Sequence, residues 1–403
     1  MKEIKKKVSV PLGFVFAAGE GGLRTHGSGP DVGLIYSSAP ARVAALFTAN
    51  RVKAAPVEVS QEFLQRSRNT AQAIVVNAGN ANCATGAQGI RSAHECSRKA
   101  AALLGVRQEQ VLLASTGVIG VPMDATCITS LLPVLCRRLR PEGYSEVSKA
   151  ILTTDTRPKV VSRSVSVNGH TVRILGMSKG AGMINPCMAT MLAFIFTDAA
   201  IDSRILRSTT ERLGDLSFNR ISVDGDTSTN DTVFIMANGL AGNPVLVKNS
   251  PAAARFAEAI IEVAQQLAIK IVMDGEGAKK LVEIQVEKAA SELQASAIAR
   301  SIGLSSLVKT AMAGADPNWG RILSAAGNAK VKFHPRLTDI YLNEVLVCRK
   351  GGAAEFNEPA LQRKLRGKEI VVRVVLRDGH AKSVFWTCDF TEEYVRINAS
   401  YRT

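Results

Sequence analysis

Residues 178–196 read SKGAGMINPCMATMLAFIF, and this stretch contains both a candidate reactive residue and the strand around which the fold can be built. It begins as a glycine-rich loop with one cation, Lys179. It then becomes the uninterrupted apolar run Met191–Phe196, which is typical of a strand buried on both faces. The sequence therefore predicts that Thr190 lies where a loop runs into a central strand.

A threonine at the start of a buried strand has three interpretations. Its hydroxyl can satisfy a nearby backbone group, since threonine is common in strands. The loop can bind a phosphate, but Lys179 precedes the glycines, so the spacing is not that of a P-loop. Thr190 can also be a nucleophile: after cleavage before it, its own α-amine can act as the base for its hydroxyl. The small Ala189 would let that hydroxyl reach the preceding carbonyl.

Strand-like and helix-like segments alternate along the whole chain, which predicts an α/β architecture. Short apolar strands are expected at Ala73–Val76 and Val111–Ala114, with a helix at Gln88–Leu104 between them. The loop Asn77–Asn82 carries small side chains, so its amides can approach a ligand or another chain segment. Further elements are expected as helices at Pro251–Ala268 and Ala290–Ile302 and as a strand with one solvated face at Val282–Val286.

Turn signals predict two hairpins. Asn168-Gly169, between two alternating runs, is the pattern of a type I′ turn. A second hairpin would join strands at 370–376 and 383–386 through a loop containing Asp378-Gly379. Strand-rich sequence on both sides of residue 190 predicts two interlocked lobes rather than separable domains.

Basic residues are in excess: Lys and Arg total 50, Asp and Glu total 35, and the net charge is +15. Taken alone, this charge suggests nucleic acid, a membrane surface or an anionic substrate as partner. Aromatic residues make up only 5% of the chain, so base-stacking platforms would be scarce. No helix-turn-helix, zinc or RNP-like motif is present. We therefore expect no nucleic-acid partner.

The cysteine pattern predicts a cytoplasmic protein with reduced thiols, because the seven cysteines form no C-x-x-C pair and no disulfide framework. Lys5–Lys7 and the apolar run Val8–Gly19 imitate a signal peptide, but a proline and a glycine interrupt the run. Residues 180–197 are 18 uncharged residues, near a transmembrane length, yet they include Asn185 and Pro186. We expect buried active-site backbone there and no membrane span. The five histidines are scattered, and no metal site is expected.

Residues 179–194 closely resemble the self-cleavage motif of the ornithine acetyltransferase family, the glutamate N-acetyltransferases of arginine biosynthesis. The resemblance covers essentially the whole chain. One departure is Asn185-Pro186-Cys187, where Ala-Pro-Asn is commoner; it leaves Lys179, Ala189 and Thr190 intact. Four further motifs follow the family's order, namely Ser115–Gly120 (STGVIG), Asp274–Ala278 (DGEGA), Asp316–Arg321 (DPNWGR) and Ile397–Thr403 (INASYRT).

The resemblance implies the layered α/β/β/α fold that ornithine acetyltransferases share with the DmpA type of aminopeptidase, in two interlocked lobes. It also implies self-cleavage between Ala189 and Thr190, which would leave an alpha chain of residues 1–189 and a beta chain of residues 190–403. The Thr190 hydroxyl would attack the Ala189 carbonyl, and water would then release the resulting ester. Family members assemble as heterotetramers of two alpha and two beta chains, and the same is expected here.

The activity that the resemblance implies is transfer of an acetyl group from N2-acetylornithine to Thr190 and then to glutamate. The α-amine of Thr190, with a reference pKa of about 7.7–8.0, would be the general base. Thr116 and Gly117 would stabilise the oxyanion. No cofactor is implied, and whether acetyl-CoA is a second acetyl donor stays open. The implied substrate contacts are Thr153 (with Thr154 as its alternative), Lys179, Thr190, Glu276, which suits the ammonium of ornithine, Asn398 and Thr403.

The alternative function is an N-terminal-nucleophile aminopeptidase on the same fold, which would share the cleavage but hydrolyse peptides. Peptidases of that fold use serine, so Thr190 favours the acetyltransferase, as do the implied contacts of Lys179 and Glu276. The net charge of +15 then becomes a surface property that favours anionic glutamate and opposes cationic ornithine. Glu276 would be the local correction that admits ornithine.

Overall fold

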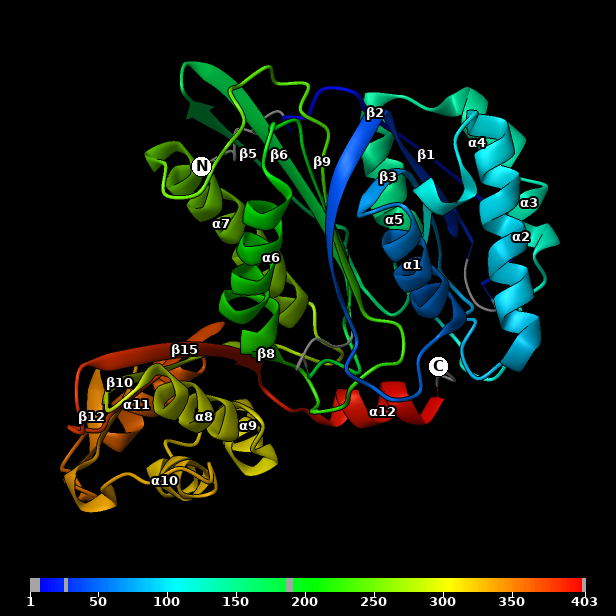
Figure 1. Ribbon diagram of the computed structural model, residues 1–403. Helices are drawn as coiled ribbons and strands as arrows, with labels where there is room; N and C mark the ends of the chain where they lie inside the picture. The colour runs from blue at the N-terminus through cyan, green and yellow to red at the C-terminus, as the bar shows by residue number, and fades with distance from the viewer. Residues whose placement is uncertain (1–7, 25–27, 186–190, 401–403) are drawn as a thin grey trace.

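The computed structural model describes residues 8–24, 28–185 and 191–400, and two β-sheets organise this part of the chain (Figure 1). The eight-stranded sheet belongs to a large lobe and the seven-stranded sheet to a smaller one. The large sheet contains β1 (Phe14–Gly19), β2 (Val32–Phe47), β3 (Thr70–Asn77), β4 (Val111–Ser115), β5 (Lys159–Val167), β6 (His170–Lys179), β7 (Leu192–Thr197) and β9 (Thr232–Ala237). The small sheet contains β8 (Ile221–Ser222), β10 (Leu281–Ala289), β11 (Asp339–Leu342), β12 (Val345–Arg349), β13 (Gly352–Ala353), β14 (Glu369–Val375) and β15 (Ala381–Cys388).

The helices are distributed over both lobes. Those of the large lobe are α1 (Ala55–Arg66), α2 (Gly86–Leu104), α3 (Thr126–Thr129), α4 (Leu132–Arg138), α5 (Tyr144–Ala150), α6 (Ser203–Leu216) and α7 (Pro251–Met273). Those of the small lobe are α8 (Glu292–Gly303), α9 (Ser306–Ala313), α10 (Trp319–Gly327) and α11 (Glu358–Leu365). The last helix, α12 (Glu392–Ser400), leaves the small lobe and returns along the large one (Figure 1).

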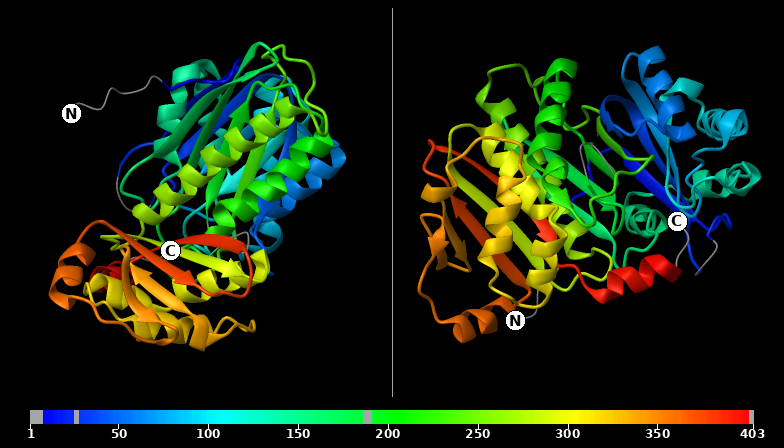
Figure 2. Two further views of the ribbon diagram at one scale, coloured as in Figure 1. Left: turned by 90° about the vertical axis from the view of Figure 1, so that its left-hand side faces the viewer. Right: turned by 90° about the horizontal axis from the view of Figure 1, so that it is seen from below.

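The long strand β2 turns the large sheet into two layers. Its first half pairs with β1 and β3, and its second half pairs with β9. The rings of Phe14 and Phe16 on β1 lie 5.1 and 5.3 Å from the ring of Phe196 on β7, so the first layer lies over the second. Helices α6 and α7 cover the outer face of the layer formed by β5, β6, β7 and β9, and α1–α5 gather beside β1–β4 (Figures 1 and 2). This is the α/β/β/α arrangement that the resemblance implied.

Strand β7 lies at the centre of these layers, and all six of its residues are buried. Phe194 and Phe196 pack into the core between the two sheet layers. Ala193 and Ile195 pack on the other face, in the core with α6 and α7. The prediction of a strand buried on both faces is confirmed. Within the described residues no helix is both long and apolar enough to cross a membrane.

Only one of the two predicted hairpins forms. Asn168 and Gly169 join β5 to β6 with φ of 49° and 84°, as a type I′ turn requires. The second prediction is wrong, because β14 and β15 do not pair: β10 lies between them, parallel to β14 and antiparallel to β15. The amides of Leu376 and Asp378 donate to carbonyls at the end of β10, so the loop crosses over that strand. β10, which comes earlier in the chain, thus pairs with β14 on one side and with β15 on the other.

The other predicted elements form with small changes at their ends. Helix α7 continues five residues beyond the predicted Ala268, to Met273, and α8 begins at Glu292 after its cap Ser291. The solvated face of β10 is confirmed, since Val282, Ile284 and Val286 are buried and the residues between them are half-buried. The lobes interlock through β8, which leaves the large lobe and pairs with β15. The boundary between the lobes lies near residue 280.

Candidate active site

A cavity of about 280 Å³ opens between the strand ends of the large lobe and helix α12. Six residues implied by the family resemblance line it: Thr116, Gly117, Thr153, Lys179, Glu276 and Asn398. The remaining three, Ala189, Thr190 and Thr403, lie outside the described residues. The other lining residues are Ile119, Thr154, Gly182, Met183, Asp224, Asp226, Thr227, Ser228, Thr229, Asn230 and Tyr394.

The register of the sheet places the start of β7 beside Lys179. Leu192, the first residue of β7, pairs with Lys179 across the antiparallel ladder. On its other side Leu192 pairs with Thr232 of β9. Lys179 lines the cavity, and its ladder partner Leu192 follows the predicted nucleophile, Thr190, by two residues in the sequence.

The loop that follows β4 is held by a close backbone approach. Gly117 has φ of +131°, and a Cβ atom there would lie 2.3 Å from the carbonyl carbon of Gly79. The amides of Thr116 and Val118 donate to the carbonyls of Asn77 and Gly79 at 3.0 and 3.2 Å. As predicted, the small side chains of residues 77–82 allow another chain segment, Thr116–Val118, to approach closely. Only glycine fits at position 117.

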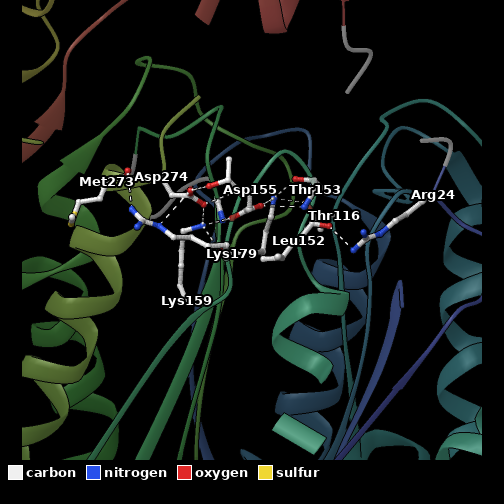
Figure 3. A network of polar contacts seen from close by, with 12 residues as sticks. Arg24, Thr116, Leu152, Thr153, Asp155, Lys159, Lys179, Met273 and Asp274 are labelled. Carbon is white, nitrogen blue, oxygen red and sulfur yellow. Dashed lines mark hydrogen bonds and ion pairs between the residues drawn. The ribbon is translucent and has the colours of Figure 1, made fainter. Parts of the chain in front are cut away.

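Lys179 lies at the end of β6, and its ammonium group faces two hydroxyls of the cavity wall (Figure 3). Its Nζ donates to Thr153 Oγ1 at 2.8 Å and to Thr116 Oγ1 at 3.3 Å. Burial lowers the pKa of Lys179, and the carboxylate of Asp155 opposes that shift. Of the two threonines left open by the sequence, Thr153 makes the contact with Lys179, while Thr154 lines the cavity.

Behind Lys179 lies a chain of buried charges (Figure 3). The Asp155 carboxylate lies 3.8 Å from Lys179 Nζ and 2.5 Å from Lys159 Nζ. Lys159 Nζ also lies 2.6 Å from the carboxylate of Asp274. Nearby, the guanidinium of Arg24 donates to the carbonyl of Leu152 at 3.0 Å and steadies the loop that leads to Thr153.

Glu276 lines the same cavity as Lys179 and is also buried. Its carboxylate accepts a hydrogen bond from Asn398 Nδ2 at 2.7 Å. Its amide donates to the carbonyl of Ala181 at 2.8 Å. A Cβ atom on Gly182 would lie 2.4 Å from the carboxylate, so the glycine-rich loop leaves room for Glu276. Glu276 therefore contacts residues of two other family motifs, the glycine-rich loop at 181–182 and the carboxyl-terminal motif at Asn398.

Asp224 and Tyr394 line the cavity, and sequence reasoning missed both. Asp224 accepts hydrogen bonds from the amides of Met183 and Ile184 at 2.5 and 2.8 Å and from the Tyr394 hydroxyl at 3.3 Å. Burial raises the pKa of Asp224 against these hydrogen bonds, and burial followed by the charge of Asp224 raises the pKa of Tyr394. The turn-forming pair Asp224-Gly225 was the only local signal that could have indicated this loop.

The lining of the cavity combines the ammonium group of Lys179 with several hydroxyls and with the carboxylates of Asp224, Asp226 and Glu276. Within the part of the chain that the structure describes, no group of three or more His, Cys, Asp or Glu side chains is arranged to hold a metal ion. An oxyanion would meet hydroxyl and backbone donors at Thr116 and Gly117. A zwitterionic amino acid could place its carboxylate toward Lys179 and an ammonium toward Glu276. These are the requirements of acyl transfer between amino acids.

Comparison with known proteins gives consistent matches. The family model described as "ArgJ family" matches residues 15–403. The "Arginine biosynthesis bifunctional protein ArgJ" of Symbiobacterium thermophilum is 45% identical over 397 residues, which cover 98% of each chain. A crystal structure of the protein of that name from Bacillus halodurans is 41% identical with a TM-score of 0.52, covering 53% of this chain and 100% of its own. An ornithine acetyltransferase structure from Mycobacterium tuberculosis, complexed with ornithine, is 28% identical with a TM-score of 0.38, covering 45% of this chain and 93% of its own.

Proposed function

The chain belongs to the ArgJ family, and from that premise we propose that it carries the acetyl group from N2-acetylornithine to glutamate as an ester of Thr190. It is a glutamate N-acetyltransferase of arginine biosynthesis, and its substrates are small molecules. The observation that supports the ester route is one cavity, next to the strand that follows Thr190, whose lining includes Lys179, Thr116, Thr153 and Glu276. The family assignment favours this activity over the aminopeptidase.

Self-cleavage prepares the nucleophile in this proposal. Attack of Thr190 Oγ1 on the Ala189 carbonyl gives an ester, and water releases the two chains 1–189 and 190–403. The beta chain would hold 214 of the 403 residues, which is 53% of the whole. The solved Bacillus halodurans chain covers the same share, 53%, of the present chain. The two chains stay together as each other's partners, and two copies of each form the proposed heterotetramer.

Acetyl transfer then proceeds in two halves. The Thr190 amine takes the proton of its hydroxyl while Oγ1 attacks the acetyl carbonyl, and the oxyanion is held by Thr116 and Gly117. Because Thr116 Oγ1 accepts a hydrogen bond from Lys179, its own proton is free to be donated into the cavity. The carbon–nitrogen bond breaks, and ornithine leaves with the proton. The α-amine of glutamate attacks the ester through the same oxyanion and restores Thr190.

Substrate orientation follows from the polarity of the cavity. The Lys179 ammonium and the Thr153 hydroxyl receive the substrate carboxylate, and Glu276, held by Asn398, receives the side-chain ammonium of ornithine. Thr403, at the carboxyl end, is proposed as a further substrate contact. The enzyme is proposed to act in the cytoplasm without a cofactor, in keeping with the six free cysteines among the described residues. Acetyl-CoA is proposed as a second acetyl donor, since the matched relatives are named bifunctional.

The experiment is a denaturing gel combined with an assay of acetyl transfer. Wild-type protein should give two chains of about 20 and 23 kDa, by dividing 42.9 kDa according to length. It should also form N-acetylglutamate from N2-acetylornithine, and from acetyl-CoA with release of thiol. Thr190→Ala should stay a single chain without activity, while the exposed Thr171→Ala should behave as wild type. A wild-type single chain that transfers no acetyl group would refute the proposal.

A further inference from the structure

Two buried ionic residues behind the cavity, Asp155 and Lys159, have no part in the chemistry above. The side chain of Asp155 is 0% exposed and that of Lys159 is 1% exposed. Burying an ion costs several kcal/mol before its partner compensates, and a well-packed apolar pair is often as stable. A pair of this kind beside an active site is therefore better explained by the charge that it places than by stability.

Asp155 contacts both chain segments that bring Thr153 and Lys179 to the cavity. One carboxylate oxygen accepts from the amide of Thr153 at 3.1 Å and lies 3.8 Å from Lys179 Nζ. The other accepts from the amide of Gly180 at 2.6 Å and from Lys159 Nζ at 2.5 Å. The Asp155 side chain thus holds the backbone amides of Thr153 and of Gly180, the residue after Lys179. It also supplies a negative charge 3.8 Å from the Lys179 ammonium group.

The charge state of Lys179 depends on this neighbour. Burial lowers the pKa of the Lys179 ammonium, and the like charge of Lys159 lowers it further. The opposing negative charges are Asp155, Glu276 and Asp231, of which Asp155 contributes most. Without the Asp155 charge, both burial and Lys159 would drive Lys179 toward the neutral amine. A neutral amine would no longer attract a carboxylate.

Lys159 in turn keeps Asp155 ionised. Burial alone would raise the pKa of Asp155, but the ammonium groups of Lys179 and Lys159, together with the hydrogen bond from the Gly180 amide, lower the pKa to about 2. Lys159 is shared with Asp274, which also accepts the amide of Thr156 at 3.1 Å and lies 3.6 Å from the Arg157 guanidinium. The chain of charges therefore continues away from the cavity and ends at a half-exposed arginine.

We propose that Asp155 is a positioning residue for acetyl transfer, which holds the Lys179 ammonium charged and directed at Thr153 and Thr116, with Lys159 as the counter-ion that keeps Asp155 ionised. The inference rests on the proposed function, because it concerns the same site. It assigns a role to two residues that do not touch the substrate.

The test is the pH profile of kcat/KM for glutamate in the isosteric variant Asp155→Asn. Removing an opposite charge at this range should move the alkaline limb, where Lys179 loses its proton, to lower pH by about one unit or more. The acid limb, set by the Thr190 amine, should stay in place. At neutral pH, KM for glutamate should rise more than kcat falls.

Two variants separate this role from a structural one. Asp274→Asn removes another buried carboxylate, 3% exposed, from the far end of the chain of charges and should leave the alkaline limb in place. In Asp155→Asn/Lys179→Arg the shift should vanish, because a guanidinium does not titrate in the assay range. A lowered activity in Asp155→Asn without any shift of the limb, or an equal shift in Asp274→Asn, would overturn the inference.

Folding of the variant does not limit the test. If Asp155→Asn does not fold, Lys179→Arg alone should abolish the alkaline limb, and a limb that persists at the wild-type pH would contradict the assignment. Failure of the proposed function is seen separately, as wild-type protein that transfers no acetyl group at any pH. If the wild-type enzyme is active and the alkaline limb of Asp155→Asn lies at the wild-type pH, the proposed function stands and only the inference about Asp155 is refuted.

Discussion

Two glycines decide how closely the walls of the cavity approach each other. At Gly117 the obstacle to a side chain is backbone, the carbonyl group of Gly79, and φ is in the left-handed region. At Gly182 the nearest obstacle is the carboxylate of Glu276, the end of a side chain. The fold therefore requires glycine at position 117, whereas glycine at position 182 is needed so that the Glu276 carboxylate can occupy its observed position.

Gly182→Ala should displace Glu276 and weaken its contact with the ammonium of N2-acetylornithine. A hydrogen bond to a charged group contributes about 1.5–3 kcal/mol, so KM for N2-acetylornithine should rise by roughly 10- to 100-fold. KM for glutamate should change much less, and thermal stability should be close to that of wild type. Steady-state kinetics with each substrate varied in turn provide the measurement.

The matched control for this substitution is Glu276→Gln, alone and combined with Gly182→Ala. The single change should itself raise KM for N2-acetylornithine, because it removes the charge. In the double variant Gly182→Ala should add little, since the charged contact is already lost. Equal effects of Gly182→Ala in both backgrounds would mean that the methyl group acts elsewhere in the cavity.

At the scale of elements, one hairpin and one helix assemble the site. The β5–β6 register pairs Lys159 with Ser178, so the type I′ turn at the far end of the hairpin brings Lys159 and Lys179 to one edge. A slip of one residue would turn every side chain to the opposite face. Helix α12 has no fully buried residue, and hydrogen bonds tie it to the large lobe through Tyr394 and Asn398 within it and through Thr391 just before it.

Tyr394→Phe should loosen α12, because it removes the hydroxyl that donates to Asp224 at 3.3 Å. Faster hydrogen exchange is expected across residues 392–400, with KM raised about 3- to 10-fold for both substrates, as for loss of one hydrogen bond of about 1 kcal/mol. Val395→Ala, on the neighbouring residue that is 62% exposed, is the control and should leave both quantities unchanged. Protection of α12 that is the same in all three proteins would contradict this account.

At the scale of the whole molecule, one continuous core contains residues from both sides of the proposed cleavage point. Phe14 and Phe16 from the alpha side pack with Phe194 and Phe196 from the beta side. Two strand ladders, β6 with β7 and β2 with β9, also join the two sides of residue 189. The halves of the proposed enzyme are therefore parts of one folded unit.

The two chains produced by cleavage should remain associated under native conditions. Size-exclusion chromatography should give one peak that contains both chains, at the same volume as the uncleaved Thr190→Ala variant. The chains should separate only in denaturant, because separation exposes the shared core and breaks two strand ladders. Dissociation of wild-type protein in dilute native buffer would show that the core does not hold the halves.

The sequence by itself determined the parts of the fold that depend on local physics. Alternation and apolar runs encode burial, so β7, β10 and α2 were predicted close to their observed bounds. Asn168-Gly169 specifies its turn because both residues tolerate positive φ. The family resemblance predicted six residues that the structure brings to one cavity, and five of them lie in motifs that are continuous in sequence.

Only the tertiary structure decided the order of the strands and the neighbours of each charge. The loop at Asp378-Gly379 has the sequence of a hairpin turn, yet it crosses β10, because that earlier strand (Leu281–Ala289) lies between the two strands that the loop joins. Lys159 and Asp274 meet across 115 positions of sequence, and Tyr394 and Asp224 across 170. Contacts of this range arise from how layers pack, and a side chain's ionisation follows from the burial and charges that packing creates around it.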